Sequence, residues 1–432
     1  MPRDLSRREF IQTAVGAGFL AIGLGNLPLF TSCKGGNELK VGLMSPATGV
    51  ARENGLPARN GFLDGFNYIN TERGGVNGRL IKPVYRDSAY NMENVVKFVN
   101  EFMDTECIMF VTHSSAEMNA AKAIANPASF PGIVSFGSQT AYHPPMHIYG
   151  QMPDYGDDWV AFAKYYKENI WKGAGKPRMA LHLLNNATGK GAEYGAQAMA
   201  DTLGFDVLRV EEHSSAITSA VESLTRIREL NPDVMFISSI PQPTAIILKE
   251  AATMGLTAAS APGGAPKMTV GCAHASFSKD LIDLAGAAAV EGVYGVYPTA
   301  TWDDDIPAIA KATEYCQKYN PSNYGNMNYL STWATALIVA EILRLSVDGT
   351  GFDTLTGGGL KAWQAVENQG IKRLSGYNVE GVQGAVSYTA GNNRLSRLTR
   401  MYKITGGKIT MVQDWTEAPT IKYEDLDWFP KG

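Results

Sequence analysis

Residues 39–69 read LKVGLMSPATGVARENGLPARNGFLDGFNYI and join a short apolar run to a longer stretch in which apolar side chains recur at helical spacing. The apolar run at 39–44 predicts a buried β-strand. In the stretch that follows, Phe62, Phe66 and Ile69 fall on one face of a helix. A strand followed by an amphipathic helix is the repeating unit of α/β folds, so this stretch predicts a parallel sheet flanked by helices.

The same alternation continues along the chain in two successive series, the second of which begins after residues 153–156. The sequence therefore predicts two α/β sheets of similar size. The expected strands are residues 39–44, 80–85, 107–111 and 133–136 in the first series, and 179–184, 205–210, 234–238 and 292–296 in the second. The later helices are expected at 159–171, 191–203, 220–230, 306–319 and 329–345.

The C-terminal region from 381 to 413 has a different pattern, with short β-type runs separated by glycine-rich turns at 391–394 and 406–407. This pattern predicts antiparallel strands joined by tight turns. The expected runs are residues 384–388, 400–404 and 409–412.

Composition narrows the class of protein. A chain of 432 residues with 45% apolar residues can bury more than one compact core, so two lobes are expected. The 38 basic and 42 acidic residues nearly balance, and no basic run is interleaved with aromatics, so we do not expect a nucleic acid partner. The three cysteines of the later chain lack metal-ligand spacing and allow at most one disulfide. They are Cys107, Cys272 and Cys316.

The N-terminus carries a predicted export signal. Arg7 and Arg8 stand just ahead of an apolar stretch at 14–30, as in twin-arginine signal peptides. A transmembrane anchor is the alternative, but the stretch is shorter than the roughly 20 apolar residues that a span requires.

Residues 29–33, LFTSC, are similar to a bacterial lipobox, although Phe30 replaces the usual leucine. We therefore predict a signal peptide at 1–33 and a lipid on Cys33 that holds the mature protein in the periplasm or at the outer face of the cytoplasmic membrane. The alternative is cleavage by an ordinary signal peptidase, with no role for Cys33.

Several motifs occur together in one order: KVGLMSPATG at 40–49, NGF at 60–62, GGVNG at 74–78, YRD at 85–87 and a strand, Ser-Ser, helix element at 111–121. As a set they resemble the periplasmic solute-binding proteins of branched-chain amino acid ABC importers, over residues 39–413. The resemblance implies a type I periplasmic-binding-protein fold. In that fold, two α/β lobes are linked by three hinge crossings, and the ligand is enclosed when the lobes close.

The resemblance also implies a division of the chain, with crossings near residues 152, 298 and 376. It implies capture of a small carboxylate, amino acid or amide for an ABC permease, with no enzymatic activity, cofactor or metal. A sensor that reports to a membrane receptor is the alternative. The expected lobes are 38–152 with 299–376, and 153–298 with 377–432.

Open parallel sheets bind ligands beyond the carboxyl ends of their strands, which locates the candidate site residues. Ser114 and Ser115 lie between a strand and a helix, where the resemblance implies contact with a ligand carboxylate. The alternative is a capping box, because Glu117 follows Ser114 at the required spacing. The resemblance implies the same ligand contact for the loop after the next strand, made of Ser138, Gln139 and Thr140.

The second lobe offers further candidates. Thr188 stands where the resembling family often has an aromatic residue, and Ser238, Ser239 and Gln242 lie at the end of the strand that begins at 234. These could hydrogen-bond a ligand or simply turn the chain. The aromatic candidates near crossings and facing loops are Tyr155, Tyr297, Trp302 and Trp333, for which core packing is the alternative.

The sequence departs from the family pattern at 270–275, VGCAHA, where amino-acid-binding members carry an acid that pairs with the ligand's ammonium group. His274 is the nearest polar side chain. A buried ammonium without a partner is costly, so the sequence favours an acid without an amine, or a neutral amide, over an α-amino acid.

A dinucleotide-dependent oxidoreductase is the enzyme alternative, because Gly189-Lys190-Gly191 follows the strand at 179–184. These glycines come too late after the strand, and Gly195 stands one position beyond the third glycine of the motif. No catalytic triad, metal cluster or paired carboxylates emerge from the pattern, so we predict a binding protein.

Overall fold

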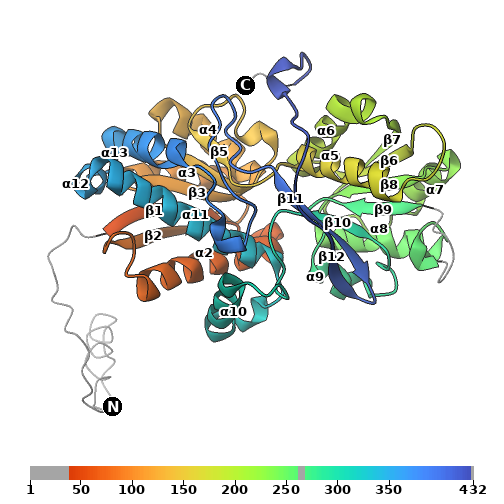
Figure 1. Cartoon of the computed structure of the whole chain (residues 1–432), viewed down its shortest axis with the longest axis horizontal. Coiled ribbons are helices and arrows are strands. Elements are labelled where there is room, and N and C mark those ends of the chain that lie inside the picture. Colours follow the sequence, from red (N-terminus) through yellow and green to blue (C-terminus); the bar gives the residue numbers. More distant parts are fainter. Residues whose placement is uncertain (1–37, 261–267, 430–432) are drawn as a thin grey trace, which may run out of the picture. The chain divides into compact units, whose positions relative to one another are not determined.

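The computed structural model describes residues 38–260 and 268–429. The predicted signal peptide and the lipid on Cys33 lie outside these residues. The described residues form one compact unit, in which Figure 1 shows two groups of strands, each with its own helices.

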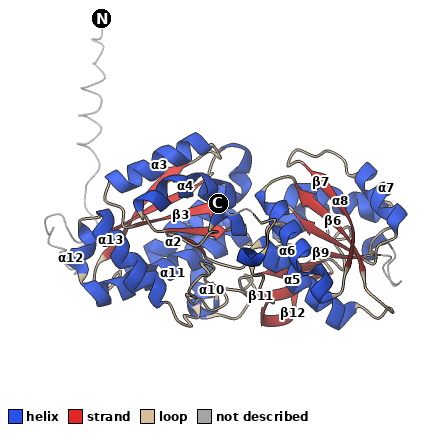
Figure 2. Ribbon diagram, turned by 90° about the horizontal axis from the view of Figure 1, so that it is seen from above, coloured by secondary structure: helices blue, strands red, loops and turns tan. Residues whose placement is uncertain are grey.

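The first sheet is built entirely from parallel pairs, in the order β2-β1-β3-β4-β5. Helices α3 and α4 cover one face, and α2 and α11 cover the other (Figure 2). Its strands are β1 (Glu38–Ser45), β2 (Leu80–Asp87), β3 (Met109–Ser114), β4 (Gly132–Phe136) and β5 (Ile148–Gly150). Its helices are α2 (Arg52–Glu72), α3 (Met92–Asp104), α4 (Ser115–Ala128), α11 (Met327–Thr350), α12 (Phe352–Thr356) and α13 (Gly359–Ala365).

The second sheet is mixed, in the order β12-β11-β10-β9-β8-β6-β7. β11 pairs antiparallel with both β10 and β12, and the other pairs are parallel. Its strands are β6 (Arg178–Leu184), β7 (Asp206–His213), β8 (Val234–Ser238), β9 (Thr269–Cys272), β10 (Tyr294–Tyr297), β11 (Leu398–Thr405) and β12 (Lys408–Glu417). The remaining helices are α5 (Tyr155–Tyr165), α6 (Ala187–Leu203), α7 (Val221–Leu230), α8 (Pro241–Thr253), α9 (Lys279–Ala285) and α10 (Pro307–Tyr319).

Helix α11 forms the centre of the first group of elements. Among the described residues it is the one helix that is long and apolar enough to cross a membrane by length and composition. Its apolar side chains are instead buried in the protein, since Trp333 is fully buried and stacks on Tyr68 of α2 at 5.3 Å. α11 is therefore the core helix of this group.

These elements confirm the predicted α/β architecture with two sheets. The antiparallel pair β11–β12, joined by Gly406 and Gly407, is also as predicted. The division of the chain between lobes stays a prediction. The cysteines Cys107, Cys272 and Cys316 are free and buried, so they form no disulfide.

Two sequence predictions were wrong. Residues 384–388 do not form a regular strand and contribute only an isolated bridge between Tyr377 and Val386. Helix α6 begins at Ala187, not at 191, because Asn186 caps it by accepting a hydrogen bond from the Thr188 N–H. Gly189 therefore lies inside the helix, where a Cβ atom would come within 2.0 Å of the Leu184 carbonyl oxygen. This glycine allows close helix–strand packing and does not form a phosphate-binding loop.

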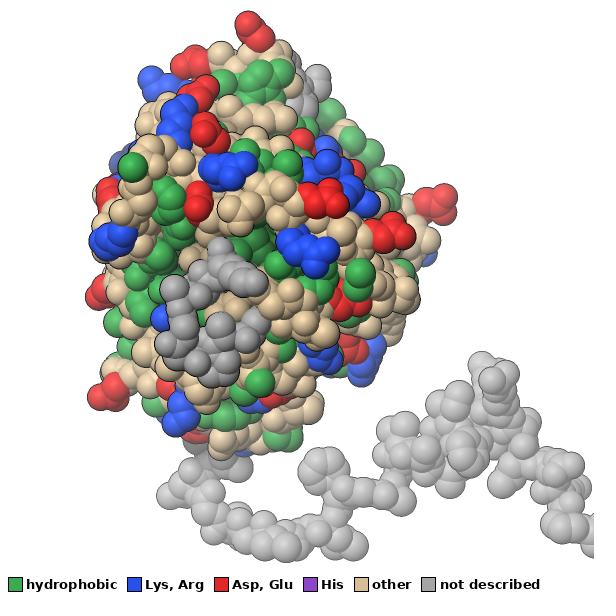
Figure 3. Space-filling model, turned by 90° about the vertical axis from the view of Figure 1, so that its right-hand side faces the viewer, with side chains coloured by type: hydrophobic (Ala, Val, Ile, Leu, Met, Phe, Trp, Pro, Cys, Tyr) green, Lys and Arg blue, Asp and Glu red, His purple; other side chains and the backbone are tan. Residues whose placement is uncertain are grey.

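The end of the molecule that carries α7 has scattered charged side chains of both signs on its surface. On the face shown in Figure 3, basic and acidic side chains are interspersed. Helix α6 carries ion pairs, since Lys190 lies 2.7 Å from Glu193 and 2.9 Å from Glu212 of β7. Surface pairs of this kind contribute little to stability, about 0–1 kcal/mol each.

Candidate functional site

The carboxyl edge of the first sheet begins with Ser114, the last residue of β3 and the N-cap of α4. Its hydroxyl accepts a hydrogen bond from the Glu117 N–H, and Glu117 Oε2 accepts from the Ser114 N–H at 3.0 Å. The capping box considered from the sequence is therefore present. It fixes the direction of α4 and leaves Ser114 half-buried beside the edge.

Ser115 connects two strand ends. Its hydroxyl accepts a hydrogen bond from the Ser138 N–H at 2.7 Å and donates to the Phe136 carbonyl at 3.2 Å. The Ser138 hydroxyl donates to Gln139 Oε1 at 3.1 Å and lies 3.1 Å from Thr140 Oγ1. The structure thus brings Ser115, Ser138, Gln139 and Thr140 into one hydrogen-bonded group.

Gln139 also reaches an element of the second sheet. Its side chain is fully buried, and Nε2 donates to the Gly191 carbonyl of α6 at 3.2 Å. A Cβ atom at Gly191 would come within 3.0 Å of Gln139 Oε1, so the absence of a side chain allows this approach. The loop after β4 and the first turns of α6 therefore meet directly.

On the second sheet, Thr188 and Ser238 lie together at the same edge. The Ser238 hydroxyl donates to the Thr188 carbonyl at 3.0 Å. Ser239 is buried, its N–H donates to Ser276 Oγ at 2.7 Å, and its hydroxyl lies 2.7 Å from His213 Nε2. Gln242 is different, because its side chain is exposed on α8 and is not brought to this group.

His274 lies after β9 and is fully buried among aromatic rings. Tyr155 stacks on it at 4.8 Å with an interplanar angle of 17°. Phe136, from the first sheet, lies 5.1 Å away, and Tyr297 lies 6.2 Å away. The ring cluster therefore combines residues that follow strands of both sheets.

Asp158, a residue of α5 that the sequence analysis did not single out, pairs with His274. Its Oδ2 lies 2.7 Å from His274 Nδ1 and accepts the His274 backbone N–H at 3.1 Å. Both side chains are fully buried, and His274 Nε2 and Asp158 Oδ1 have no partner among the described residues. Burial raises the pKa of Asp158, while the attraction of His274 opposes that rise. In the sequence, Asp158 reads as an ordinary acid in the first turn of a helix.

Tyr155 lies near both edges, with the side chains of Thr188 and Ser115 both close to its hydroxyl. Burial raises the pKa of Tyr155, although these two side chains act to lower it, so the hydroxyl stays protonated. Tyr297 is buried, and its hydroxyl lies 3.5 Å from Ser331 Oγ in α11. Trp302 donates to the Asn326 carbonyl at 3.0 Å, and Trp333 lies in the core, so core packing accounts for both tryptophans.

A charged cluster adjoins the site at the start of α5. The buried guanidinium of Arg394 lies 3.1 Å from Asp154 Oδ2 and contacts Asp157. Tyr142 and Tyr423 donate to Asp154 at 2.6 and 3.2 Å. Burial raises the pKa of Asp157, against the opposing attraction of Arg394. The sequence did not predict this cluster, because its members lie far apart in the chain.

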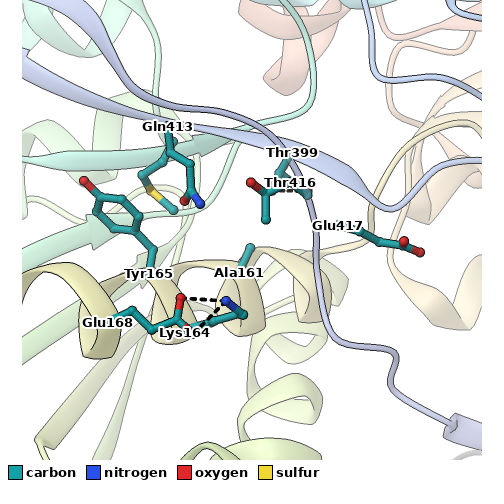
Figure 4. Close-up of a pocket in the computed structure, with 9 residues that line it drawn as sticks. Ala161, Lys164, Tyr165, Glu168, Thr399, Gln413, Thr416 and Glu417 are labelled. Carbon is teal, nitrogen blue, oxygen red and sulfur yellow. Dashed lines mark hydrogen bonds and ion pairs between the residues drawn. The ribbon is translucent and has the colours of Figure 1, made fainter.

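The small pocket drawn in Figure 4 is a separate feature, between α5 and the strands β11 and β12. The Lys164–Glu168 ion pair, at 2.6 Å, closes one side of it. Its cavity volume of about 10 Å³ suits one water molecule, so it is too small for a solute. Over residues 38–260 and 268–429, no three histidine, cysteine or acidic side chains are grouped as metal ligands.

Residues 38–408 match the model of a family described as periplasmic binding proteins. A comparison with curated protein sequences finds no match. Among solved structures, a branched-chain amino acid ABC transporter protein from Thermus thermophilus with bound valine has a TM-score of 0.76 and 23% identity, covering 89% of this chain and 97% of that one.

Two further structures have the same fold. A fatty acid ABC transporter substrate-binding protein from Thermomonospora curvata has a TM-score of 0.72 and 19% identity, covering 88% of this chain and 92% of that one. A branched-chain amino acid transporter substrate-binding protein from Streptococcus pneumoniae, in complex with isoleucine, has a TM-score of 0.68 and 16% identity, covering 87% of this chain and 99% of that one.

Proposed function

Because the chain belongs to the periplasmic binding protein family, we propose that it captures a small carboxylate, amino acid or amide between its two lobes and delivers it to the permease of an ABC importer. Members of this family bind solutes outside the cytoplasm and are not enzymes. The proposed lobes are residues 38–152 with 299–376, and 153–298 with 377–432.

The observation that carries this proposal is the meeting of the two sheet edges at Gln139 and at the ring cluster of Tyr155 and His274. Gln139, in the loop after β4, donates to the Gly191 carbonyl of α6 at 3.2 Å. Tyr155 of α5 stacks on His274, whose ring also lies 5.1 Å from Phe136 at the end of β4. Parallel sheets bind ligands at these carboxyl edges. Two such edges that contact each other support capture by closure of one lobe onto the other.

The first lobe supplies hydrogen-bond donors for an acidic or amide group. The hydroxyls of Ser115, Ser138 and Thr140 belong to one bonded group, and hydroxyl protons rotate to suit a new acceptor. The N-terminus of α4, directly beside Ser115, adds free backbone N–H groups and the positive end of a helix dipole. A ligand carboxylate fits these donors.

The second lobe supplies an acid that residues 270–275 lack. Asp158 lies 2.7 Å from the His274 ring, so a buried carboxylate is present where the sequence pattern indicated none. The ammonium group of an amino acid would then have a partner, which removes the reason to exclude this class. Amino acids therefore stand beside simple carboxylates and amides as proposed ligands.

Differential scanning fluorimetry of the chain from residue 34 onward tests the proposal against amino acids, aromatic acids, short fatty acids and amides. A ligand at 100 times its Kd stabilises the folded protein by about 2.7 kcal/mol, so at least one compound should raise the Tm. The proposal fails if none does.

Variants test which residues bind. With the best compound, Ser115→Ala and His274→Ala should each weaken binding about tenfold or more in calorimetry, because each removes a buried hydrogen-bonding group. Ser346→Ala is the matched control, since Ser346 is a buried serine that bonds only within α11, to the Ile342 carbonyl at 2.7 Å. Equal effects of Ser115→Ala and Ser346→Ala on affinity would exclude the proposed role of Ser115.

The tether is a separate part of the proposal and rests on the LFTSC motif at 29–33. Two acyl chains on Cys33 would keep the binding protein beside its permease. In a host that processes lipoproteins, the chain should fractionate with membranes, and Cys33→Ala should release it. Equal membrane binding of both forms would rule out the lipid on Cys33.

A further inference from the structure

Four buried side chains form a continuous hydrogen-bonded chain across β8, β6 and β7. Ser223 Oγ, on α7, lies 2.9 Å from His182 Nε2, and His182 Nδ1 lies 2.9 Å from His213 Nδ1. His213 Nε2 lies 2.7 Å from Ser239 Oγ. One end is thus at a helix inside the lobe, and the other is at the sheet edge that carries the proposed site.

The number of protons available decides which group donates in each hydrogen bond of this chain. The single hydroxyl proton of Ser223 is donated to the Ala220 carbonyl at 2.9 Å, so toward His182 this serine can only accept. His182 must then carry its proton on Nε2 and accept at Nδ1. His213 donates from Nδ1, which leaves its Nε2 as an acceptor for the Ser239 hydroxyl proton.

Both imidazoles must be neutral for this arrangement, because each ring accepts a hydrogen bond at one nitrogen, His182 at Nδ1 and His213 at Nε2. Burial satisfies this condition, since it lowers the pKa of His182 to about 3 and that of His213 to about 4. The charged groups nearest His182 are Glu211 and Arg226, which pair with each other at 2.6 Å.

The reverse direction is less favourable. If Ser223 donated to His182, every proton in the chain would shift and Ser239 would turn its proton outward. The bond from Ser223 to Ala220 would then be lost, and the Ala220 carbonyl would keep only the Leu224 N–H at 2.9 Å. One net hydrogen bond corresponds to a factor of about five in equilibrium.

We propose that Ser223, His182 and His213 hold the Ser239 hydroxyl with its proton turned inward, so that Ser239 presents an acceptor to the ligand. The chemistry that fits is an N–H donor, from an ammonium or an amide group. This inference rests on the proposed function, because it takes Ser239 as part of the ligand site. Ser223, His182 and His213 are then positioning residues that select the ligand without touching it.

Histidine tautomers give a test that needs no ligand. The protein has six histidines, so ¹⁵N-histidine labelling yields a small set of ring signals. The His182→Gln and His213→Gln variants assign the signals of these two rings. We expect the Nε2–H form for His182 and the Nδ1–H form for His213. The opposite pair of tautomers would overturn the assignment of Ser239 as an acceptor.

Ligand selectivity gives the second test, with valine and 3-methyl-2-oxobutanoate as probes of the same carbon skeleton, one with an ammonium group and one without. Ser223→Ala removes the group that fixes the direction, so the preference for valine should shrink about fivefold. Ser346→Ala, the buried serine control in α11, should leave the ratio unchanged. An unchanged ratio in Ser223→Ala would overturn the proposal.

The two tests separate this inference from the proposed function. If neither probe binds and no other compound raises the Tm, the proposed function fails, while the tautomers still decide the direction of the chain. If ligands bind but the tautomers are reversed, the proposed function stands, and the role proposed for Ser223, His182 and His213 is wrong.

Discussion

Glu117 is a fully buried carboxyl group, held by the Ser88 hydroxyl at 2.6 Å and by the Ser114 N–H at 3.0 Å. Burial raises its pKa to about 7, although the hydrogen bonds from Ser88 and Ser114 oppose the rise. The folded state therefore holds this proton more tightly than the unfolded state. Its contribution to stability is present at low pH and is lost as the pH rises from about 5 through about 7.

Glu117→Gln removes this titration while keeping the shape of the side chain. The free energy of unfolding, measured in urea at a series of pH values, should change less with pH in the variant. Between about pH 5 and pH 8 the difference from the unaltered protein should be about 3 kcal/mol. Glu93→Gln is the control, because Glu93 is an exposed acid in the first turn of α3. If the free energy of unfolding changes with pH in the same way in the Glu117→Gln variant and in the unaltered protein, the expectation is contradicted.

Individual residues differ in how far the sequence predicts them. Ser115 and Ser138 follow strands, and a strand end is visible as the end of an apolar run. No local pattern distinguishes Asp158, because acids are common in the first turn of a helix, where they cap free N–H groups and interact favourably with the helix dipole. Its partner His274 is 116 positions away, and only the folded chain brings the two together.

At the scale of elements, strands and helices were predictable because their apolar spacing is local. Helix α6 shows where this fails. Gly189 was predicted to lie before the helix, but it lies inside α6. A Cβ atom at Gly189, Gly191 or Gly195 would come within 3.0 Å of Leu184, Gln139 or Gly156, respectively. Whether a glycine marks a turn or a close approach depends on neighbours that the local pattern does not contain.

Gly195→Ala should therefore weaken the packing of α6 on α5. The new Cβ atom would lie 2.6 Å from both the Cα and the carbonyl oxygen of Gly156, and backbone atoms cannot move aside as a flexible side chain can. The cost should be about 1–3 kcal/mol in the free energy of unfolding, measured by urea denaturation. Gly357→Ala is the control, because a Cβ atom there meets nothing within 4 Å. A loss no larger than in this control would show that α6 can shift away from α5.

At the scale of the whole molecule, the apolar spacing of the sequence predicted two sheets but not the contacts that connect them. Arg394 follows Asn393, whose carbonyl accepts the Gly150 N–H of β5 at 2.8 Å, so its segment is attached to the first sheet. Its guanidinium pairs with Asp154 and Asp157 at the start of α5, which packs on the second. These charges are about 240 positions apart, beyond the reach of any periodicity argument.

Replacing Arg394 with methionine tests how much these ion pairs contribute to stability. The side chain would keep much of its volume, but the two buried aspartates would lose their counter-charge, at a cost of about 3–5 kcal/mol. The triple variant Arg394→Met with Asp154→Asn and Asp157→Asn should recover part of that loss, because it leaves no uncompensated charge. Urea unfolding of the single and triple variants measures both effects. If the triple variant is no more stable than the single one, the cluster acts through shape and hydrogen bonding and not through its charge.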